Sequence, residues 1–188
     1  MVALTAHAGG ADEKLTRVAD VPRDLPLVER VVARLVVLDV SGRVLLLHTK
    51  DPTYPELGTW WELPGGGVEA DESYVDAAIR ELHEESGIVV TPSQITPSTW
   101  QRDASFRYRG RRYLNHESVM KVQLDQPGPD IDGSHRVDFE DEDYFGYRWW
   151  TVPELAGSTE TFYPRRLPNL LPRFIQGHQI QEPFELWS

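Results

Sequence analysis

The chain has 188 residues, with 19 Lys and Arg against 30 Asp and Glu, so its formal net charge is -11 and its pI is near 4.9. This acidity argues against a general nucleic-acid-binding protein, because binding driven by counterion release needs a basic surface. The absence of cysteine excludes disulfides and Cys-based metal sites. Neither a signal-peptide pattern nor a run of about 20 apolar residues is present, so we expect a cytoplasmic protein without a membrane anchor.

The beginning of the chain predicts an extension followed by a β-hairpin. Residues 1–26 lack sustained periodicity and contain Gly and Pro, so we expect a flexible N-terminal extension. A single domain should occupy residues 27–188 and end in a helical and irregular tail. Within it, residues 31–38 and 44–47 are rich in β-branched and aliphatic side chains around a turn at 39–43. Their continuous apolar character favours strands covered on both faces.

The next segment predicts a strand that leads through a glycine turn into a long helix. Residues 51–57 contain two prolines and indicate a loop, and residues 58–63 predict a short strand before Pro64 and three glycines. Apolar side chains recur with helical spacing up to Ser86, as expected for one face of a packed helix. Ser73 with Asp76 forms a candidate capping box, and Gly87 suits the left-handed residue that ends a helix.

The second half of the chain predicts more strands and then helices. Two strands separated by an Arg-Gly-Arg turn are followed by a long acidic loop, a last strand and two helical pieces, and loops this long are usually functional or disordered. The expected ranges are 96–108, 112–124, 125–146 for the loop, 147–152, 153–155 and 167–175. This order of strands and helices favours an α/β fold in which a mixed β-sheet lies between helices.

Three carboxylates gather on one face of the predicted helix. Glu81, Glu84 and Glu85 are three and four positions apart and share an arc of the helical wheel. Their mutual repulsion needs compensation that Arg80 alone cannot supply, whereas a hard cation such as Mg2+ or Mn2+ binds oxygen ligands of this kind. A solvated acidic helix face remains the alternative reading of the triplet by itself.

The wider pattern decides between these readings. Between Gly66 and Ile88 the order is Gly, five residues, Glu72, seven residues, Arg80-Glu81, an aliphatic residue, any residue, Glu84-Glu85, any residue, Gly87 and an aliphatic residue. This order resembles the signature of the Nudix (MutT-like) hydrolase family, G-x5-E-x7-R-E-U-x-E-E-x-G-U with U aliphatic, and fills every position of it. The resemblance implies a Nudix-type α/β/α sandwich with a mixed β-sheet.

The resemblance also implies roles for the signature residues. Glu81, Glu84 and Glu85 would be catalytic and would bind the metal together with the carbonyl of Gly66, with Mg2+ or Mn2+ as cofactor. Arg80 would orient a ligand carboxylate from outside the metal's direct ligands. Glu72 would have a structural role.

A general base outside the signature varies within the family, so the sequence leaves it open. Glu117 and Glu142 are candidates, with Glu140 as an alternative to Glu142, and a solvent-facing carboxylate is the plain alternative for each. For substrate binding, we expect Arg102, Arg107 and Arg111 of the arginine-rich hairpin, interleaved with aromatic residues, to grip a nucleotide. Arg34 is a further candidate for a phosphate contact; a solvated hairpin and a snorkelling side chain are the alternatives.

The predicted function is a metal-dependent pyrophosphohydrolase that cleaves a nucleoside diphosphate linked to a group X by water attack on phosphorus. Candidate substrates are nucleoside triphosphates, ADP-ribose or other nucleotide sugars, and dinucleoside polyphosphates. The alternative from another class is a catalytically inactive Nudix domain that binds a nucleotide and regulates a partner. The resemblance leaves a homodimer open, and a small-molecule nucleotide is the expected partner rather than nucleic acid.

Overall fold

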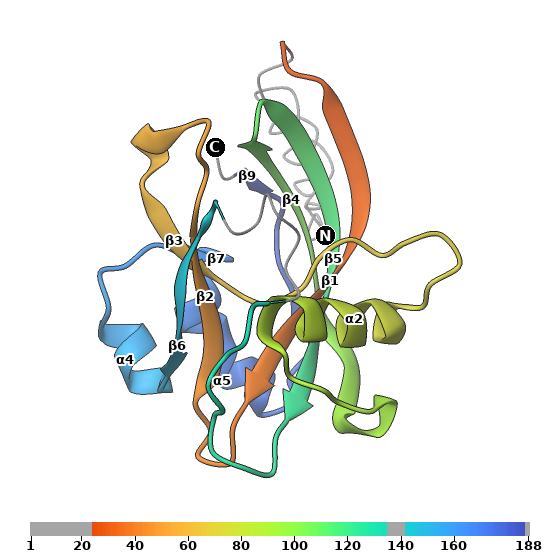
Figure 1. The fold of residues 1–188 in the computed structure, drawn as a ribbon, viewed down its shortest axis with the longest axis vertical. Coiled ribbons are helices and arrows are strands. Elements are labelled where there is room, and N and C mark those ends of the chain that lie inside the picture. Colours follow the sequence, from red (N-terminus) through yellow and green to blue (C-terminus); the bar gives the residue numbers. More distant parts are fainter. Residues whose placement is uncertain (1–23, 135–141, 187–188) are drawn as a thin grey trace, which may run out of the picture.

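The computed structural model describes residues 24–134 and 142–186. The extension expected over residues 1–26 therefore lies almost wholly outside the described residues, as do Glu140 and part of the acidic loop. The remaining chain forms a mixed β-sheet with helices on both sides (Figure 1), and this confirms the predicted fold class.

The sheet consists of two parts that meet at the β1–β2 hairpin. In the first part, β2 pairs antiparallel with both β3 and β6, and β3 pairs in parallel with β7. In the second part, β1 pairs in parallel with β5 along its whole length, and β5 pairs antiparallel with β4, whose other edge carries β8 and β9. The strands are β1 Leu27–Leu38, β2 Val44–Lys50, β3 Thr59–Glu62, β4 Ile95–Tyr108, β5 Arg111–Gln123, β6 Tyr144–Trp150, β7 Phe162–Tyr163, β8 Ile180–Gln181 and β9 Glu185–Leu186.

Only one residue pair, Leu38 with Val44, joins β1 to β2. The two parts of the sheet therefore separate beyond the hairpin, with β2, β3 and β6 on the left of Figure 1 and β1, β4 and β5 on the right. The predicted hairpin turn is present, because Asp39 accepts hydrogen bonds from the backbone N–H groups of Ser41 and Arg43. The separation leaves room for a cleft between the two parts of the sheet.

Several strand boundaries differ from the prediction, among them the start of β1 and both ends of β6. β1 begins four residues earlier than expected, because residues 27–30, two apolar and two charged, pair with β5. β6 spans Tyr144–Trp150 rather than residues 147–152, because Thr151 caps the helix α4, Val152–Gly157, by accepting a hydrogen bond from the N–H of Glu154. The acidic loop is correspondingly shorter than predicted at its C-terminal end.

Alternate residues of β1 pack in opposite directions and so create two cores. Leu35 and Val37 join the cluster under the helix α2, Tyr74–Ser86, whereas Val36 and Leu38 join the cluster that includes α5, Leu167–Ile175. The strands of the hairpin are thus covered on both faces, as the sequence predicted. This arrangement is the α/β/α sandwich.

The predicted helix over 73–86 is confirmed as α2. Ser73 is its N-cap and accepts a hydrogen bond from the N–H of Asp76, and Gly87 ends it with φ 70°. Ala78 and Leu82 are fully buried against the sheet. The helix is therefore held firmly, and its polar face keeps a defined direction.

The turn between β3 and α2 lies along the free edge of β1. The N–H groups of Ala33 and Leu35 donate to the carbonyls of Gly66 and Pro64 at 3.0 and 2.9 Å. Gly65 has φ 126°, and a Cβ atom there would lie 2.1 Å from the carbonyl oxygen of Ala33. Glycine is required at this position by both conformation and space, and the close approach carries the chain across to the start of α2.

Candidate active site

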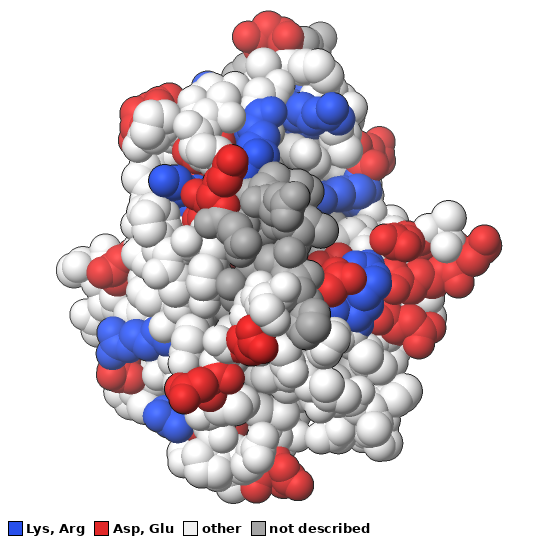
Figure 2. Space-filling view, in the orientation of Figure 1, with Lys and Arg blue, Asp and Glu red and all other residues white. Residues whose placement is uncertain are grey.

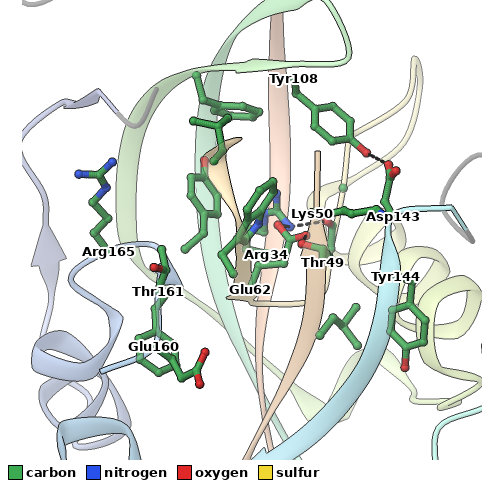
Figure 3. A pocket seen from close by; sticks show the side chains of 18 of the residues that line it. Arg34, Thr49, Lys50, Glu62, Tyr108, Asp143, Tyr144, Glu160, Thr161 and Arg165 are labelled. Carbon is green, nitrogen blue, oxygen red and sulfur yellow. Dashed lines mark hydrogen bonds and ion pairs between the residues drawn. The ribbon is translucent and has the colours of Figure 1, made fainter. Parts of the chain in front are cut away.

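A cleft of about 870 Å³ lies between the two parts of the sheet. Its walls come from β1, β2 and β3, from the β4–β5 hairpin, and from the segment after α4 (Figure 3). Aromatic, cationic and acidic side chains line it together with the glycine turn. They include Arg30, Arg34, Lys50, Trp60, Glu62, Glu81, Glu85, Phe106, Arg107, Tyr108, Tyr113, Asp143, Tyr163 and Arg165, with Gly65, Gly66 and Gly67.

Two of the three predicted catalytic carboxylates face this cleft next to the glycine turn. Glu85 accepts a hydrogen bond from the N–H of Gly65 at 2.7 Å. Glu81 lies against Gly66 so closely that a Cβ atom on that glycine would be 2.4 Å from its Oε1 atom. The helix and the turn thus assemble a site to which Glu81, Glu85 and the three glycines contribute together.

Arg80 holds the remaining acidic residues of the signature. It binds Glu72 through two hydrogen bonds of 2.9 and 3.0 Å, and it donates to the carbonyl oxygen of Gly67 at 2.9 Å. The same guanidinium pairs with Glu81 at 2.8 Å and with Glu84 at 3.1 Å. Figure 2 shows acidic side chains around α2 and the loop before it, with basic atoms among them. Arg80 therefore orients the carboxylates, and Glu72 anchors Arg80 to the turn.

At Glu81 and Glu85 the nearby positive charge does not offset the cost of burying a carboxylate. Burial raises the pKa of Glu85 well above its ordinary value, and the nearby charge of Glu81 raises it further. Burial also raises the pKa of Glu81, although Arg80 acts in the opposite direction. A cation bound between them would relieve this cost.

The donor atoms available in the cleft suit a hard divalent cation. Glu81 and Glu85 offer only oxygen, the ligand type that Mg2+ and Mn2+ prefer. The predicted carbonyl of Gly66 accepts a hydrogen bond from Ala33, which leaves one lone pair. Glu84 is turned onto Arg80, and among residues 24–134 and 142–186 no three acidic or His side chains lie close enough to hold one ion. The oxygen ligands of Glu81 and Glu85 therefore suit such a metal ion, whereas the carboxylate of Glu84 does not lie beside these two carboxylates.

Arg34 lines the cleft, but its side chain is hydrogen-bonded to the backbone before α2. It is buried and donates from Nη1 to the carbonyls of Leu63 and Gly65, each at 2.9 Å. Burial acts to lower its pKa, but the charges of Glu62 and Glu117 outweigh this and raise the pKa above its ordinary value. Arg34 therefore stays charged and fixes the glycine turn through these two hydrogen bonds.

The three hairpin arginines predicted to bind substrate have different surroundings. Arg107 lines the cleft, and its guanidinium lies 5.0 Å from the centre of the Tyr54 ring. Arg102 is buried outside the cleft and pairs with Glu185 and, at 3.5 Å, with Glu182. Arg111 is exposed at the turn and does not line the cleft. The structure places only Arg107 of the three where a substrate could reach it.

Neither described candidate for the general base faces the cleft. Glu117 is buried at 2% exposure, accepts a hydrogen bond from the Tyr163 hydroxyl at 2.8 Å, and lies near Arg34 and Arg102. Burial acts to raise its pKa, but Arg102 and Arg34 hold the pKa below its ordinary value. Glu142 is largely exposed and pairs with Arg109 at 3.4 Å. The burial of Glu117 argues against its acting as the general base, and Glu142 does not line the cleft.

Sequence reasoning missed several residues that do line the cleft. Glu62 accepts a hydrogen bond from Thr49 and lies 3.6 Å from Arg34, as Figure 3 shows. Asp143 accepts from the hydroxyl of Tyr108 and from the guanidinium of Arg109, which ties the hairpin to the start of β6. The available signal was strand alternation, which places Trp60 and Glu62 on one face of β3 and Trp61 on the other.

Comparison with known proteins places this geometry in a family. A model of the NUDIX domain matches residues 28–174, which is most of the chain. The chain belongs to the Nudix hydrolase family. The family membership that the sequence signature predicted is therefore confirmed. Of the signature residues, Gly66, Glu81 and Glu85 lie together at the glycine turn.

Two of the similar curated proteins are named as pyrophosphohydrolases. An RNA pyrophosphohydrolase from Marinomonas sp. is 26% identical over 127 residues, which cover 60% of this chain and 75% of that protein. A CTP pyrophosphohydrolase from Escherichia coli is 36% identical over 83 residues, or 44% of this chain and 57% of that protein. The two names differ in substrate, so they agree on the class of reaction alone.

Solved structures confirm the Nudix fold. A MutT protein from Methanosarcina mazei Go1 has a TM-score of 0.56 and 20% identity, covering 83% of this chain and 98% of that chain. An Ap4A hydrolase from C. elegans in a binary complex has a TM-score of 0.51 and 21% identity, covering 79% and 98%. At this identity the likeness shows the fold only. No helix among the described residues is long and apolar enough to cross a membrane.

Proposed function

We propose that this Nudix protein is a metal-dependent pyrophosphohydrolase acting on a nucleoside diphosphate linked to a further group. In this reaction a water oxygen forms a bond to phosphorus while the bond to the bridging oxygen breaks, that oxygen leaves with the electron pair, and the proton lost by the water passes to the departing phosphate or to solvent. The observation that carries the proposal is the cleft in which Glu81, Glu85 and the glycine turn lie at the foot of walls rich in aromatic and cationic side chains.

Each part of the cleft has a task in this proposal. Glu81 and Glu85, with Glu84 after release from Arg80, would hold Mg2+ or Mn2+, which supplies positive charge next to the phosphate oxygens. Arg80 and Arg34 keep the helix and the turn in register, so that the carboxylates need no rearrangement of the backbone. The protein would thus supply a preorganised anionic pocket for the metal.

The outer walls suit the nucleoside. Phe106 and Tyr113 are stacked with ring centres 5.5 Å apart, and the guanidinium of Arg30 lies 4.7 Å from the centre of the Tyr113 ring. Aromatic rings and guanidinium planes stack on nucleobases, and guanidinium groups also donate to phosphate. Arg107 and Lys50 add positive charge to the same cleft. These cations would offset the negative net charge of the chain where the substrate enters.

The test is release of phosphate or pyrophosphate with Mg2+ or Mn2+ from a panel of substrates. The panel contains nucleoside triphosphates, ADP-ribose and other nucleotide sugars, dinucleoside polyphosphates and RNA with a 5′-triphosphate. Glu85→Gln and Glu81→Gln should each lower kcat by at least about 100-fold, because each removes a charge that acts on the reacting groups. Asp125→Asn, in an exposed loop, is the matched control and should keep full activity.

Two results would contradict the proposal. Turnover that persists in Glu85→Gln would place the chemistry elsewhere. A folded wild-type protein that binds nucleotides tightly but turns none of them over would favour the alternative, an inactive Nudix domain that regulates a partner.

A further inference from the structure

A group of buried charges lies beneath the cleft, outside the predicted metal site. We call it the buried charge cluster; it consists of Arg34, Arg102, Glu117, Glu182 and Glu185. Glu117 is at its centre, with its carboxylate oxygens 3.8 Å from Nε of Arg34 and 3.6 Å from Nε of Arg102. Arg102 also pairs with Glu185 and, at 3.5 Å, with Glu182. Two cations therefore share three carboxylates in the interior.

Tyr163 lies between the cleft and the other members of the cluster, next to Arg34. Its hydroxyl donates to Glu117 at 2.8 Å, and its ring centre lies 5.4 Å from the guanidinium of Arg34 and 4.8 Å from that of Arg102. Tyr163 and Arg34 line the cleft, whereas Glu117 and Arg102 do not. Charges held this way are costly unless they are paired, so each partner constrains the position of the others.

The buried charge cluster is hydrogen-bonded to the glycine turn through Arg34. Arg34 donates a hydrogen bond to the carbonyl of Gly65 at 2.9 Å, and the N–H of Gly65 donates to Glu85 at 2.7 Å. A shift of the Arg34 guanidinium would move the peptide groups on both sides of Gly65 and, with them, the hydrogen bond that orients Glu85. The path from Glu117 to Glu85 thus passes through one side chain and one backbone residue.

The C-terminal segment supplies two members of the cluster. Glu182 follows β8 and Glu185 lies in β9, both of which pair with β4. Glu182 also accepts a hydrogen bond from the indole N–H of Trp100 at 2.7 Å. Both residues lie beyond residue 174, where the match to the family model ends. This part of the support is therefore a feature of this chain rather than of the matched domain.

We propose that Glu117 is a positioning residue that acts through Arg34 on the Gly65 turn, and that Glu185 of the C-terminal segment completes this support by holding Arg102. The proposal rests on the function proposed above for Glu85, but its structural half does not depend on turnover. Glu117 needs no access to substrate in this role, which agrees with its complete burial.

The first experiment measures hydrogen exchange of the Gly65 amide in the full chain, without substrate. Glu117→Gln should speed this exchange at least about ten-fold relative to wild type, because the Gly65–Glu85 hydrogen bond opens more often. Asp39→Asn is the matched control. Asp39 is equally buried and pairs with Arg43 at 2.7 Å, but it lies at the β1–β2 turn away from the cleft. Equal exchange rates at Gly65 in the two variants would overturn the proposal.

The second experiment compares kcat with KM on whichever substrate turns over. Loss of a supporting partner lowers activity by about 10–100-fold, so Glu117→Gln should lower kcat in this range with KM changed less than about two-fold. Asp39→Asn should lower the unfolding midpoint without this loss in kcat. A Glu117→Gln protein with wild-type kcat and only reduced stability would show that the residue is merely structural.

Two further variants complete the test. One replaces Glu117→Gln if that protein does not fold, and the other tests the role of Glu185 in the C-terminal segment. If Glu117→Gln does not fold, Tyr163→Phe removes only the hydroxyl that binds Glu117, and faster Gly65 exchange is again the expected result. Glu185→Gln should have the same effect in weaker form, at least about three-fold, and unchanged exchange would remove the C-terminal segment from the proposal. Faster exchange in a protein without any turnover would refute the proposed function while leaving the positioning path intact.

Discussion

Three consecutive glycines next to the carboxylates make different demands, so alanine at each should have a different effect. At Gly65 an added Cβ atom would lie 2.1 Å from the backbone oxygen of Ala33, and φ is 126°. At Gly66 it would meet the carboxylate of Glu81 at 2.4 Å, and at Gly67 it would meet nothing within 4 Å. All three substitutions restrict the backbone in the same way. Alanine at Gly65 clashes with backbone, alanine at Gly66 clashes with a side chain, and alanine at Gly67 has no clash.

The expected sizes follow from these contacts. Gly65→Ala should lower the free energy of unfolding by about 2–5 kcal/mol, from overpacking against an immobile backbone and from strain at positive φ. Gly66→Ala should keep the fold, because the end of a side chain can move, but it should lower kcat about 100-fold, since displacements near 1 Å at reacting groups have such effects. Gly67→Ala should change the free energy of unfolding by less than about 1 kcal/mol.

Urea denaturation followed by fluorescence gives the stabilities, and phosphate release gives kcat for the folded variants. Both quantities are needed, because a backbone clash lowers the stability whereas a displaced Glu81 lowers kcat. A Gly66→Ala protein with wild-type kcat would refute the placement of Glu81 against this glycine. A Gly67→Ala protein as unstable as Gly65→Ala would refute the argument that the clash with β1, rather than general loss of flexibility, determines the cost.

Three smaller predictions test the walls and the frame of the cleft. Arg107→Ala should raise KM several-fold while Arg111→Ala leaves it unchanged, since only the first lines the cleft; equal effects in steady-state kinetics would contradict this. The hydrogen bonds that His116 donates to Glu29 and, with a smaller effect, to Asp103 raise the pKa of His116, so its stabilising effect is complete below the unfolded pKa and is lost as pH rises through the folded pKa. Wild type should therefore exceed His116→Gln in unfolding free energy more at pH 6 than at pH 9, and a gap that widens with pH would disprove the pairing. Ser73→Ala should lower the unfolding free energy by about 1 kcal/mol, because α2 loses its N-cap, and thermal unfolding with no change in Tm would count against that bond.

The local features were predictable because they depend on near neighbours in the sequence. The helix α2, its cap at Ser73 and its end at Gly87 follow from spacing and from the conformations these residues favour. Arg80 and Glu84 are one helical turn apart, so their pairing also follows from local geometry. The start of β1 was missed because residues 27–30 mix apolar and charged side chains and become a strand only by pairing with β5, a partner more than 80 residues away.

The sequence by itself determined the family, the helix that carries the carboxylates and the glycine turn before it, because each is encoded in a short, continuous pattern. Tertiary structure alone decided which charged residues meet. Five arginines within eleven positions look alike in sequence, yet β4–β5 pairing directs Arg107 into the cleft and Arg102 into the interior beside Glu117. The physical reason is that a strand residue's environment depends on what packs against its face, and those partners come from distant parts of the chain. Glu117, a candidate base in the sequence, therefore lies in the folded protein among buried arginines.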